Sequence, residues 1–580
     1  MNPIPQSSDV DVAAQCFLNA LFRETRDWKH VSEALPGHKE HIHLPLSSSH
    51  SLSFPLRYFS PTQHHQYQFP ALLISHSSPE GEPVNVQTWV SLILEKPAIR
   101  TELNRNVIKR FQQRVLASHT NTWQAIRLRH RWSDLRLRPL AFSDAEQALL
   151  VGHAFHPAPK SHEPFNDAEA LRYLPEFGSR FPLRWLSVEC QYIAGESLGL
   201  TLRARLLRIA AQNAPGLLHH FSDTHWLVPM HPWQAQHLLS QSWCQQLVTH
   251  GAVSDLGEAG SSWFPTSSSR SLYSPASNDM IKFSLSVRLT NSVRTLSVKE
   301  VKRGMRLARL AQTARWQALQ LQHPTMRVMQ EDGWAGLRNE EGAIQEESLM
   351  ALRVNLLFDM PATQTNVLVS LTQAAPDGGD SLLAAAVRRL SIRLGLSLTQ
   401  AAQCWLNAYC DHVLLPLFST EANFGLVLLA HQQNILVEMQ EDLPIGLLYR
   451  DCQGSGFTDN ASDWLADIDE ADAENRFSRE QVLRYFPYYL LVNSTLAVTA
   501  ALGAAGFATE RHLMDQVRDK LTALRNHVID TRTLDYVLDS KHWNCKGNFH
   551  CYLHDHNENT IVNPAVIYFD FQNPFYRENA

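Results

Sequence analysis

A cluster of small hydroxyl residues around one arginine, Thr266–Leu272, is the segment with the clearest chemical potential. The segment reads TSSSRSL, and Lys282, Thr290 and Arg294 follow it. Arginine grips carboxylate or phosphate through paired hydrogen bonds, lysine acts as a point charge, and hydroxyls donate hydrogen bonds. The combination favours a ligand with several oxyanions. If residues 280–293 form one regular strand, spacings of eight and four residues place Lys282, Thr290 and Arg294 on the same face.

The same region is strongly basic. Between residues 280 and 309 eight lysines and arginines accompany a single acid, Glu300. A solvated basic face, or a surface that binds a polyanion such as nucleic acid, is therefore an alternative interpretation. Phe283 is the single aromatic residue among these bases, which argues against a nucleic-acid groove.

Two histidine-bearing loops could supply further polar groups. His153, His156 and Lys160 fall within one short segment rich in proline. Two cationic or donor side chains four residues apart can reach a phosphate chain, although isolated histidines of this kind are often structural. His231-Pro-Trp-Gln is best explained as a turn fixed against the core.

A third polar loop lies further along the chain. His431-Gln-Gln-Asn434 precedes an apolar strand and a turn at Pro444, and Arg450-Asp451 follows the next strand. Such a loop with an acid behind it could hold a substrate and a magnesium ion. It also loosely resembles the catalytic loop of a phosphotransferase, and this interpretation stays open.

His550, His554, Asp555 and His556 form a possible metal-binding group near the carboxyl terminus. The neighbouring pattern looks strand-like, which would point the first two histidines to one face and Asp555 to the other. We do not favour a metal site there.

These residues must be positioned by the elements around them. Residues 12–24 predict a helix, 152–165 a loop, 184–193 and 280–293 strands, 297–322 helical structure, and 426–449 a hairpin-like unit. Residues 485–509 carry no charge, but Pro487 and several polar residues favour a helix buried in a domain over a membrane span. The acidic residues 459–474 are expected to be solvated surface.

The overall composition agrees with a folded enzyme-sized protein. The chain has 580 residues, 44% hydrophobic and 19% charged, with a net charge of −6. This predicts roughly two to four domains. Eight scattered cysteines without a CxxC pair, and a polar amino terminus without a leader pattern, predict a cytoplasmic protein.

Taken together, the polar segments resemble the IucA/IucC family of siderophore synthetases, which work without a nonribosomal peptide template. The motifs that carry this resemblance are His156-Pro-x-x-Lys160, His231-Pro-Trp-Gln234, the Thr266–Leu272 loop with Lys282, Thr290 and Arg294, His431-x-Gln-Asn434, and Arg450-Asp451.

The resemblance implies an α+β fold of three parts arranged as a cupped hand. The thumb would be an α+β unit over residues 1–140, the fingers a strand-rich unit over 141–345, and the palm, mostly helical with a small kinase-like sheet, would cover 346–580. ATP and citrate would bind between fingers and palm.

The resemblance also implies roles for individual residues. Residues expected to contact ATP are His156, Lys160, Ser268, Arg270, Ser271, Lys282 and Asp451, with Asp451 also serving Mg²⁺. Residues expected to hold citrate are Thr290, Arg294, His431 and Gln433. Residues expected to take part in catalysis are His156, Lys282, Arg294 and His431. Many members carry a glutamate two residues before the palm histidine, where this chain has Leu429.

The implied reaction is adenylation of a citrate carboxylate and its condensation with the amine of N6-acetyl-N6-hydroxylysine, with release of AMP and pyrophosphate. A homo-oligomer without nucleic-acid or membrane partners is expected. Two alternatives remain: a related synthetase that uses another amine or a citryl monoamide, and a non-enzymatic anion-binding or nucleic-acid-binding protein.

Overall fold

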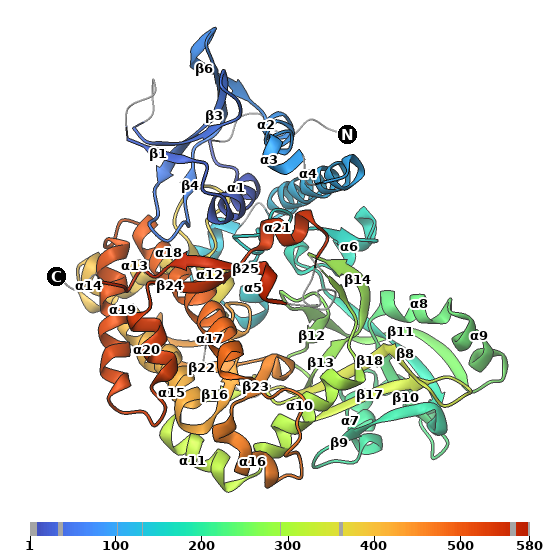
Figure 1. Cartoon of the computed structure of the whole chain (residues 1–580). Coiled ribbons are helices and arrows are strands. Elements are labelled where there is room, and N and C mark those ends of the chain that lie inside the picture. Colours follow the sequence, from blue (N-terminus) through green and yellow to red (C-terminus); the bar gives the residue numbers. More distant parts are fainter. Residues whose placement is uncertain are drawn as a thin grey trace.

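The computed structural model combines helices and strands around three large hydrophobic cores (Figure 1). We group its elements into three regions, although the cores also take in residues of neighbouring regions. It describes residues 9–32, 39–100, 103–129, 132–290, 292–358, 364–556 and 564–577. Among these residues no helix is long and apolar enough to cross a membrane.

The first region is an antiparallel sheet with helices packed against it. The helix predicted over residues 12–24 is confirmed as α1 (Val12–Glu24), and the Asp11 side chain caps its first turn. The strands, in the order β1-β2-β3-β5-β6 with β4 beside β3, are β1 (Lys29–Val31), β2 (His41–Pro45), β3 (His50–Tyr58), β4 (Gln66–Tyr67), β5 (Ala71–Ser75) and β6 (Ser78–Val84). The other helices are α2 (Val86–Leu94), α3 (Pro97–Arg100) and α4 (Arg105–Leu128).

The second region is built on an eight-stranded sheet, ordered β10-β8-β11-β12-β13-β18-β17-β9. Its strands are β8 (Phe181–Glu189), β9 (Ile193–Ser197), β10 (His225–Met230), β11 (Val253–Pro265), β12 (Ser271–Tyr273), β13 (Asp279–Phe283), β17 (Gly333–Arg338) and β18 (Ile344–Val354). A small sheet beside it contains β7 (His162–Glu163), β14 (Leu285–Leu289) and β15 (Ser292–Arg294). The helices of this region are α5 (Phe142–Gln147), α6 (Asp167–Tyr173), α7 (Leu202–Asn213), α8 (Pro232–Leu239), α9 (Ser242–Thr249), α10 (Val298–Leu310) and α11 (Ala314–Gln322).

The third region is mostly helical around a four-stranded sheet, ordered β16-β22-β21-β19. Its strands are β16 (Met326–Val328), β19 (Gln364–Val367), β20 (Leu426–Leu428), β21 (Ile435–Gln440), β22 (Leu443–Tyr449), β23 (Ser455–Phe457), β24 (His542–Lys546) and β25 (Tyr568–Gln572). Its helices are α12 (Leu368–Thr372), α13 (Leu382–Leu394), α14 (Leu398–Tyr409), α15 (Leu415–Phe424), α16 (Ser462–Ala466), α17 (Arg479–Pro487), the π-helix η8 (Tyr488–Thr495), α18 (Leu496–Ala504), α19 (Glu510–Arg525), α20 (Arg532–Asp539) and α21 (Asn548–Leu553).

The prediction of a single strand over residues 280–293 is wrong. The chain forms β13, then β14, then turns at Thr290 to enter β15, which pairs back on β14. Thr290 has φ +58, which is unusual for a β-branched residue. Lys282 and Arg294 therefore come to line one cavity through a folded hairpin and not through the alternation of one strand.

The uncharged segment 485–509 forms helical structure inside the third core, as expected, through the end of α17, then η8 and α18. The acidic segment is largely exposed as predicted, but two of its carboxylates pair with the basic helix α10. Glu470 and Glu474 bind Arg306, at 3.0 and 2.8 Å, and the same two acids bind Arg309 and Arg303.

Some elements pack outside the region that sequence order suggests. β18 runs across the division predicted at 345/346 and pairs with both β13 and β17. The carboxyl-terminal helix α21 lies beside α1 and α4, and Phe549 packs edge-on against Phe17 at 5.4 Å (Figure 1).

Candidate active site

The predicted polar residues converge on one cavity. Its volume is about 430 Å³, and it is lined by segments that lie up to about 400 residues apart in sequence. All eleven predicted site residues line it: His156, Lys160, Ser268, Arg270, Ser271, Lys282, Thr290, Arg294, His431, Gln433 and Asp451.

The loop Thr266–Arg270 is the hairpin turn between β11 and β12. Thr266 N–H donates to the Ser271 carbonyl, and Ser271 N–H donates to the Ser268 hydroxyl at 3.2 Å. Ser271 then pairs with Lys282 across β12 and β13. The sheet register therefore brings the hydroxyl loop and the lysine to the same cavity wall.

Arg270 and Arg294 form a pair of neighbouring cations. Arg270 donates to the Arg294 carbonyl at 2.9 Å, and Arg294 donates to the Thr290 hydroxyl at 2.9 Å. Within the described chain neither guanidinium has a carboxylate in ion-pair range. Burial, with Arg270 nearby, lowers the pKa of Arg294 to about 10, so the group stays charged at neutral pH. Such buried charge is costly until an anion compensates it.

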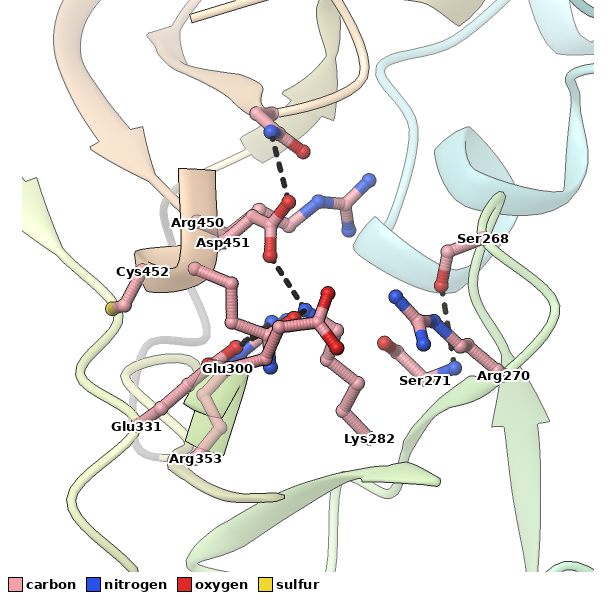
Figure 2. Close-up of polar contacts among 12 residues, drawn as sticks. Ser268, Arg270, Ser271, Lys282, Glu300, Glu331, Arg353, Arg450, Asp451 and Cys452 are labelled. Atoms are coloured by element: carbon pink, nitrogen blue, oxygen red, sulfur yellow. Dashed lines mark hydrogen bonds and ion pairs between the residues drawn. The ribbon is translucent and has the colours of Figure 1, made fainter. Parts of the chain in front are cut away.

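Lys282 forms the centre of a charged network. Its ammonium lies 2.5 Å from Asp451 Oδ1 and 2.8 Å from Gln453 Oε1, and 3.6 Å from Glu331 (Figure 2). Burial would raise the pKa of Asp451, but Lys282, Arg353 and Arg270 lower it well below its usual range. Asp451 therefore stays ionised. It has a left-handed backbone conformation, φ +81, two residues after the end of β22.

The loop with His156 and Lys160 forms another wall. His156 is 3% exposed, and its Nδ1 accepts a hydrogen bond from Ala158 N–H. Lys160 donates to the Leu149 carbonyl at 3.0 Å and lies 3.3 Å from Glu176. Its charge already has a partner, unlike that of Arg270 or Arg294.

The loop between β20 and β21 carries His431 and Gln433. Asn493 of η8 fixes this loop: its Oδ1 accepts from Gln432 N–H at 3.2 Å, and its amide nitrogen lies 3.1 Å from Nε2 of His153. One residue of a π-helix thus bridges the two histidine loops. π-Helical turns are frequent at functional sites. Leu429, at the position of the family glutamate, is packed against the third core.

Sequence reasoning missed several lining residues. Arg353 lines the cavity and is held by Glu331 at 2.6 Å, and Arg450 is held by Glu146 at 2.8 Å. Arg450 directly precedes Asp451, which was predicted to contact ATP, and this position in the sequence could have identified it. Arg353 lies in the apolar, buried half of β18. The only sequence signal for a role in the site was a charged residue among apolar ones. A further group of lining residues comes from the carboxyl-terminal third: Tyr488, Tyr489, Asn493, Lys546, Asn548, Cys551 and His556.

The carboxyl-terminal histidine group is arranged differently from the strand-like prediction. His550 lies in helix α21, and Asp555 forms ion pairs with Arg110, Arg114 and Arg288. Over the described residues no set of three histidine, cysteine or acidic side chains is placed to hold a metal ion.

The fold and the site define an α+β protein with a cavity lined by several lysines and arginines. Comparisons with known proteins identify the family. Residues 141–373 match the family model described as IucA / IucC family, and residues 403–561 match one described as ferric iron reductase FhuF-like transporter.

The curated relatives extend over almost the whole chain. The chain is 60% identical to the N(2)-citryl-N(6)-acetyl-N(6)-hydroxylysine synthase of Escherichia coli, covering 99% of both chains. It is 41% identical to the enzyme of the same name from Vibrio mimicus, over 97% of this chain and 95% of the relative.

A solved structure agrees. The ATP-bound aerobactin synthetase IucA from a hypervirulent pathotype of Klebsiella pneumoniae superposes with a TM-score of 0.94 at 61% identity, covering 98% of this chain and 100% of that one. The chain belongs to the IucA / IucC family.

Proposed function

We propose that the protein is an ATP-dependent ligase of siderophore biosynthesis. It adenylates one carboxylate of citrate and joins the resulting acyl group to the amine of N6-acetyl-N6-hydroxylysine, releasing AMP and pyrophosphate. The observation that carries this proposal is the uncompensated cation pair Arg270 and Arg294 beside the Lys282–Asp451 contact in one cavity. The names of the two synthases and the ATP-bound synthetase support the substrates.

The chemistry requires many positive charges in one place. A free carboxylate is a poor acyl donor, so a citrate oxygen attacks the α-phosphorus of ATP and pyrophosphate leaves. The amine nitrogen then attacks the citryl carbon, the bond from that carbon to the AMP oxygen breaks, and a proton is lost from nitrogen. Fixed cations stabilise the charge that develops on phosphorus and on the leaving group.

We assign the triphosphate to the wall that carries His156, Ser268, Arg270, Ser271 and Lys282, with Lys160 behind it. We assign the citrate carboxylates to Thr290, Arg294, His431 and Gln433. Lys282, Arg294, His431 and His156 then surround the reacting oxygen and phosphorus.

Magnesium is part of the same proposal. Mg²⁺ prefers one or two carboxylates together with phosphate oxygens. Asp451 is ionised and lines the cavity, with Lys282 on its Oδ1 and the Asn434 amide donating to its Oδ2 at 3.4 Å. Glu331 is bound by Arg353. The residues fit the ion: Asp451 would hold it, and the ion would neutralise phosphate charge.

We extend the proposal to the architecture. The three regions correspond to thumb, fingers and palm, with the fingers extended to Val354 so that β18 stays whole. A homo-oligomer, cytoplasmic location and the absence of nucleic-acid partners remain predictions.

The basic run between 280 and 309 gives little support to the alternative of nucleic-acid binding. Arg288, Arg303, Arg306 and Arg309 each pair with a carboxylate, so these charges are largely neutralised within the protein.

The direct test is incubation with ATP, Mg²⁺, citrate and N6-acetyl-N6-hydroxylysine, with the nucleotide product and the mass of the coupled product both measured. The proposal expects AMP, pyrophosphate and a citryl amide. ADP as the product would favour the phosphotransferase alternative. A second run with a citryl monoamide in place of citrate distinguishes the related synthetase.

A further inference from the structure

The cavity has a second wall with a different chemical character. We call it the C-terminal wall, and its members are Tyr488, Tyr489, Asn493, Lys546, Asn548, Cys551 and His556. It contains two phenol rings and two amides but a single permanent charge, that of Lys546. The remainder of the cavity is dominated by Arg270, Arg294 and Lys282. A single polyanionic ligand would need only the cationic surface and not the C-terminal wall.

Carboxylates are scarce throughout the lining. Within the part of the chain that the structure describes, the cavity is lined by Glu176 and Asp451 alone among acids. The first is held by Lys160 and the second by Lys282. Neither belongs to the C-terminal wall. Among the described residues, this wall offers no carboxylate to balance the several positive charges of a polyamine.

The C-terminal wall adjoins the proposed citrate end. The ring of Tyr489 lies 5.8 Å from that of His431. Asn493 of the same wall lies 3.1 Å from Nε2 of His153 and accepts a hydrogen bond from Gln432 N–H, next to His431. Lys546 and His431 line the same cavity, so the lysine faces the space in which the citryl carbon would be attacked.

The position of the wall is fixed by the first region of the fold. Glu24, at the end of α1, accepts hydrogen bonds from the backbone N–H groups of Phe549 and His550, at 2.6 and 2.9 Å. Its carboxylate therefore caps the start of α21. Asn548, the first residue of that helix, is 7% exposed. The amide and Lys546, two residues earlier at the end of β24, are held in place before a ligand arrives.

We propose that the C-terminal wall is the subsite of the amine acceptor, and that Lys546 recognises a carboxylate on the carbon that bears the attacking amine. The inference rests on the proposed function. The acceptor class it selects is an α-amino acid whose side chain is neutral at its far end. The tyrosine rings cover the methylene chain, Asn548 hydrogen-bonds the neutral acyl-hydroxylamine end, and Lys546 pairs with the α-carboxylate.

The test pairs a substrate deletion with a side-chain deletion. Lys546→Met is compared with wild type on N6-acetyl-N6-hydroxylysine and on N-acetyl-N-hydroxycadaverine, which lacks only the carboxylate. We expect kcat/KM for the amino acid to fall about 10- to 100-fold, the size of one charge-assisted hydrogen bond, mainly through KM. For the cadaverine analogue we expect a change below about 2-fold, because the group that Lys546 binds is already gone.

Two controls separate the subsite from the rest of the site. Lys541→Met removes an exposed charge just before the same strand, and it should affect neither amine. Citrate-dependent exchange of pyrophosphate into ATP needs no amine, so Lys546→Met should retain it.

Equal losses on both amines would overturn the carboxylate assignment. Loss of exchange in Lys546→Met with a native melting curve would place Lys546 in the citrate or nucleotide site, and the subsite proposal would be wrong while the proposed function stands. Absence of exchange in the wild-type protein would instead contradict the proposed function.

Discussion

At the scale of single residues, the arginines of this protein divide into two kinds. Arg353, Arg450 and Arg306 are each bound by carboxylates, whereas Arg270 and Arg294 hold carbonyl and hydroxyl oxygens and face the cavity. A buried cation without an anion costs stability, so the two kinds should respond oppositely to mutation.

Arg294→Met should abolish chemistry without harming the fold. We expect citrate-dependent pyrophosphate exchange to fall at least about 100-fold, because a fixed charge at the reacting oxygens is lost. The melting temperature should equal or exceed that of wild type, since a like charge beside Arg270 is removed. Arg203→Met, which removes one half of an exposed pair with Asp223, is the matched control and should change neither quantity. Exchange near the wild-type rate would refute the anion-binding role.

Arg306→Met is expected to behave in the opposite way. Its guanidinium is bound by Glu470, Glu474 and Asn475, and removal leaves Asn475 without this partner and the two carboxylates with only Arg309 and Arg303. We expect a loss of about 3 kcal/mol in the free energy of unfolding, measured by urea denaturation. An unchanged urea midpoint would show that this contact contributes little.

At the scale of elements, the turn between β14 and β15 contradicts the prediction of a single strand over residues 280–293. The predicted residues Lys282, Thr290 and Arg294 nevertheless line one cavity. A period of two correctly suggested strand structure, but local sequence gave no sign that Thr290 would adopt φ +58 and reverse the chain. The loop before the β21–β22 hairpin and the helix over residues 12–24 were predictable, because each depends on local patterning. The approach of α21 to α1 was not, because it depends on a contact across more than 500 residues.

Thr290→Gly tests whether that turn stores strain for the site. Glycine adopts positive φ without steric cost, so we expect a stability gain of up to about 1 kcal/mol. The hydroxyl that receives Arg294 is lost, so the KM for citrate should rise. Thr290→Ser, which restores the hydroxyl, should recover most of the affinity. A fall in stability with glycine would mean that the turn is not strained.

At the scale of the whole molecule, several histidines are buried in neutral form. Burial lowers the pKa values of His65, His153 and His231 to about 3, and that of His64 well below its ordinary value. Below pH 6.5 the unfolded chain binds protons at these positions and the folded protein does not. Their contribution to stability is therefore complete above pH 6.5 and is lost as the pH falls towards 3.

His231→Asn isolates one of these groups. His231 is fully buried and caps α8 by accepting from Trp233 N–H, a role that asparagine can keep. We expect the slope of unfolding free energy between pH 4 and 6 to decrease by up to about 1.4 kcal/mol per pH unit, followed by urea titrations at each pH. An unaltered slope would show that His231 is not among the groups that take up protons on unfolding.

The proposed reaction requires a citrate oxygen to meet the α-phosphorus of ATP in the cavity between the second and third regions. The most direct measurement uses citrate labelled with ¹⁸O in its carboxylates, together with ATP, Mg²⁺ and the amine, and determines the mass of the released nucleotide. Adenylation transfers one labelled oxygen to AMP, so AMP should be heavier by one ¹⁸O and the pyrophosphate should be unlabelled. Unlabelled AMP, or label in inorganic phosphate alongside ADP, would contradict the account.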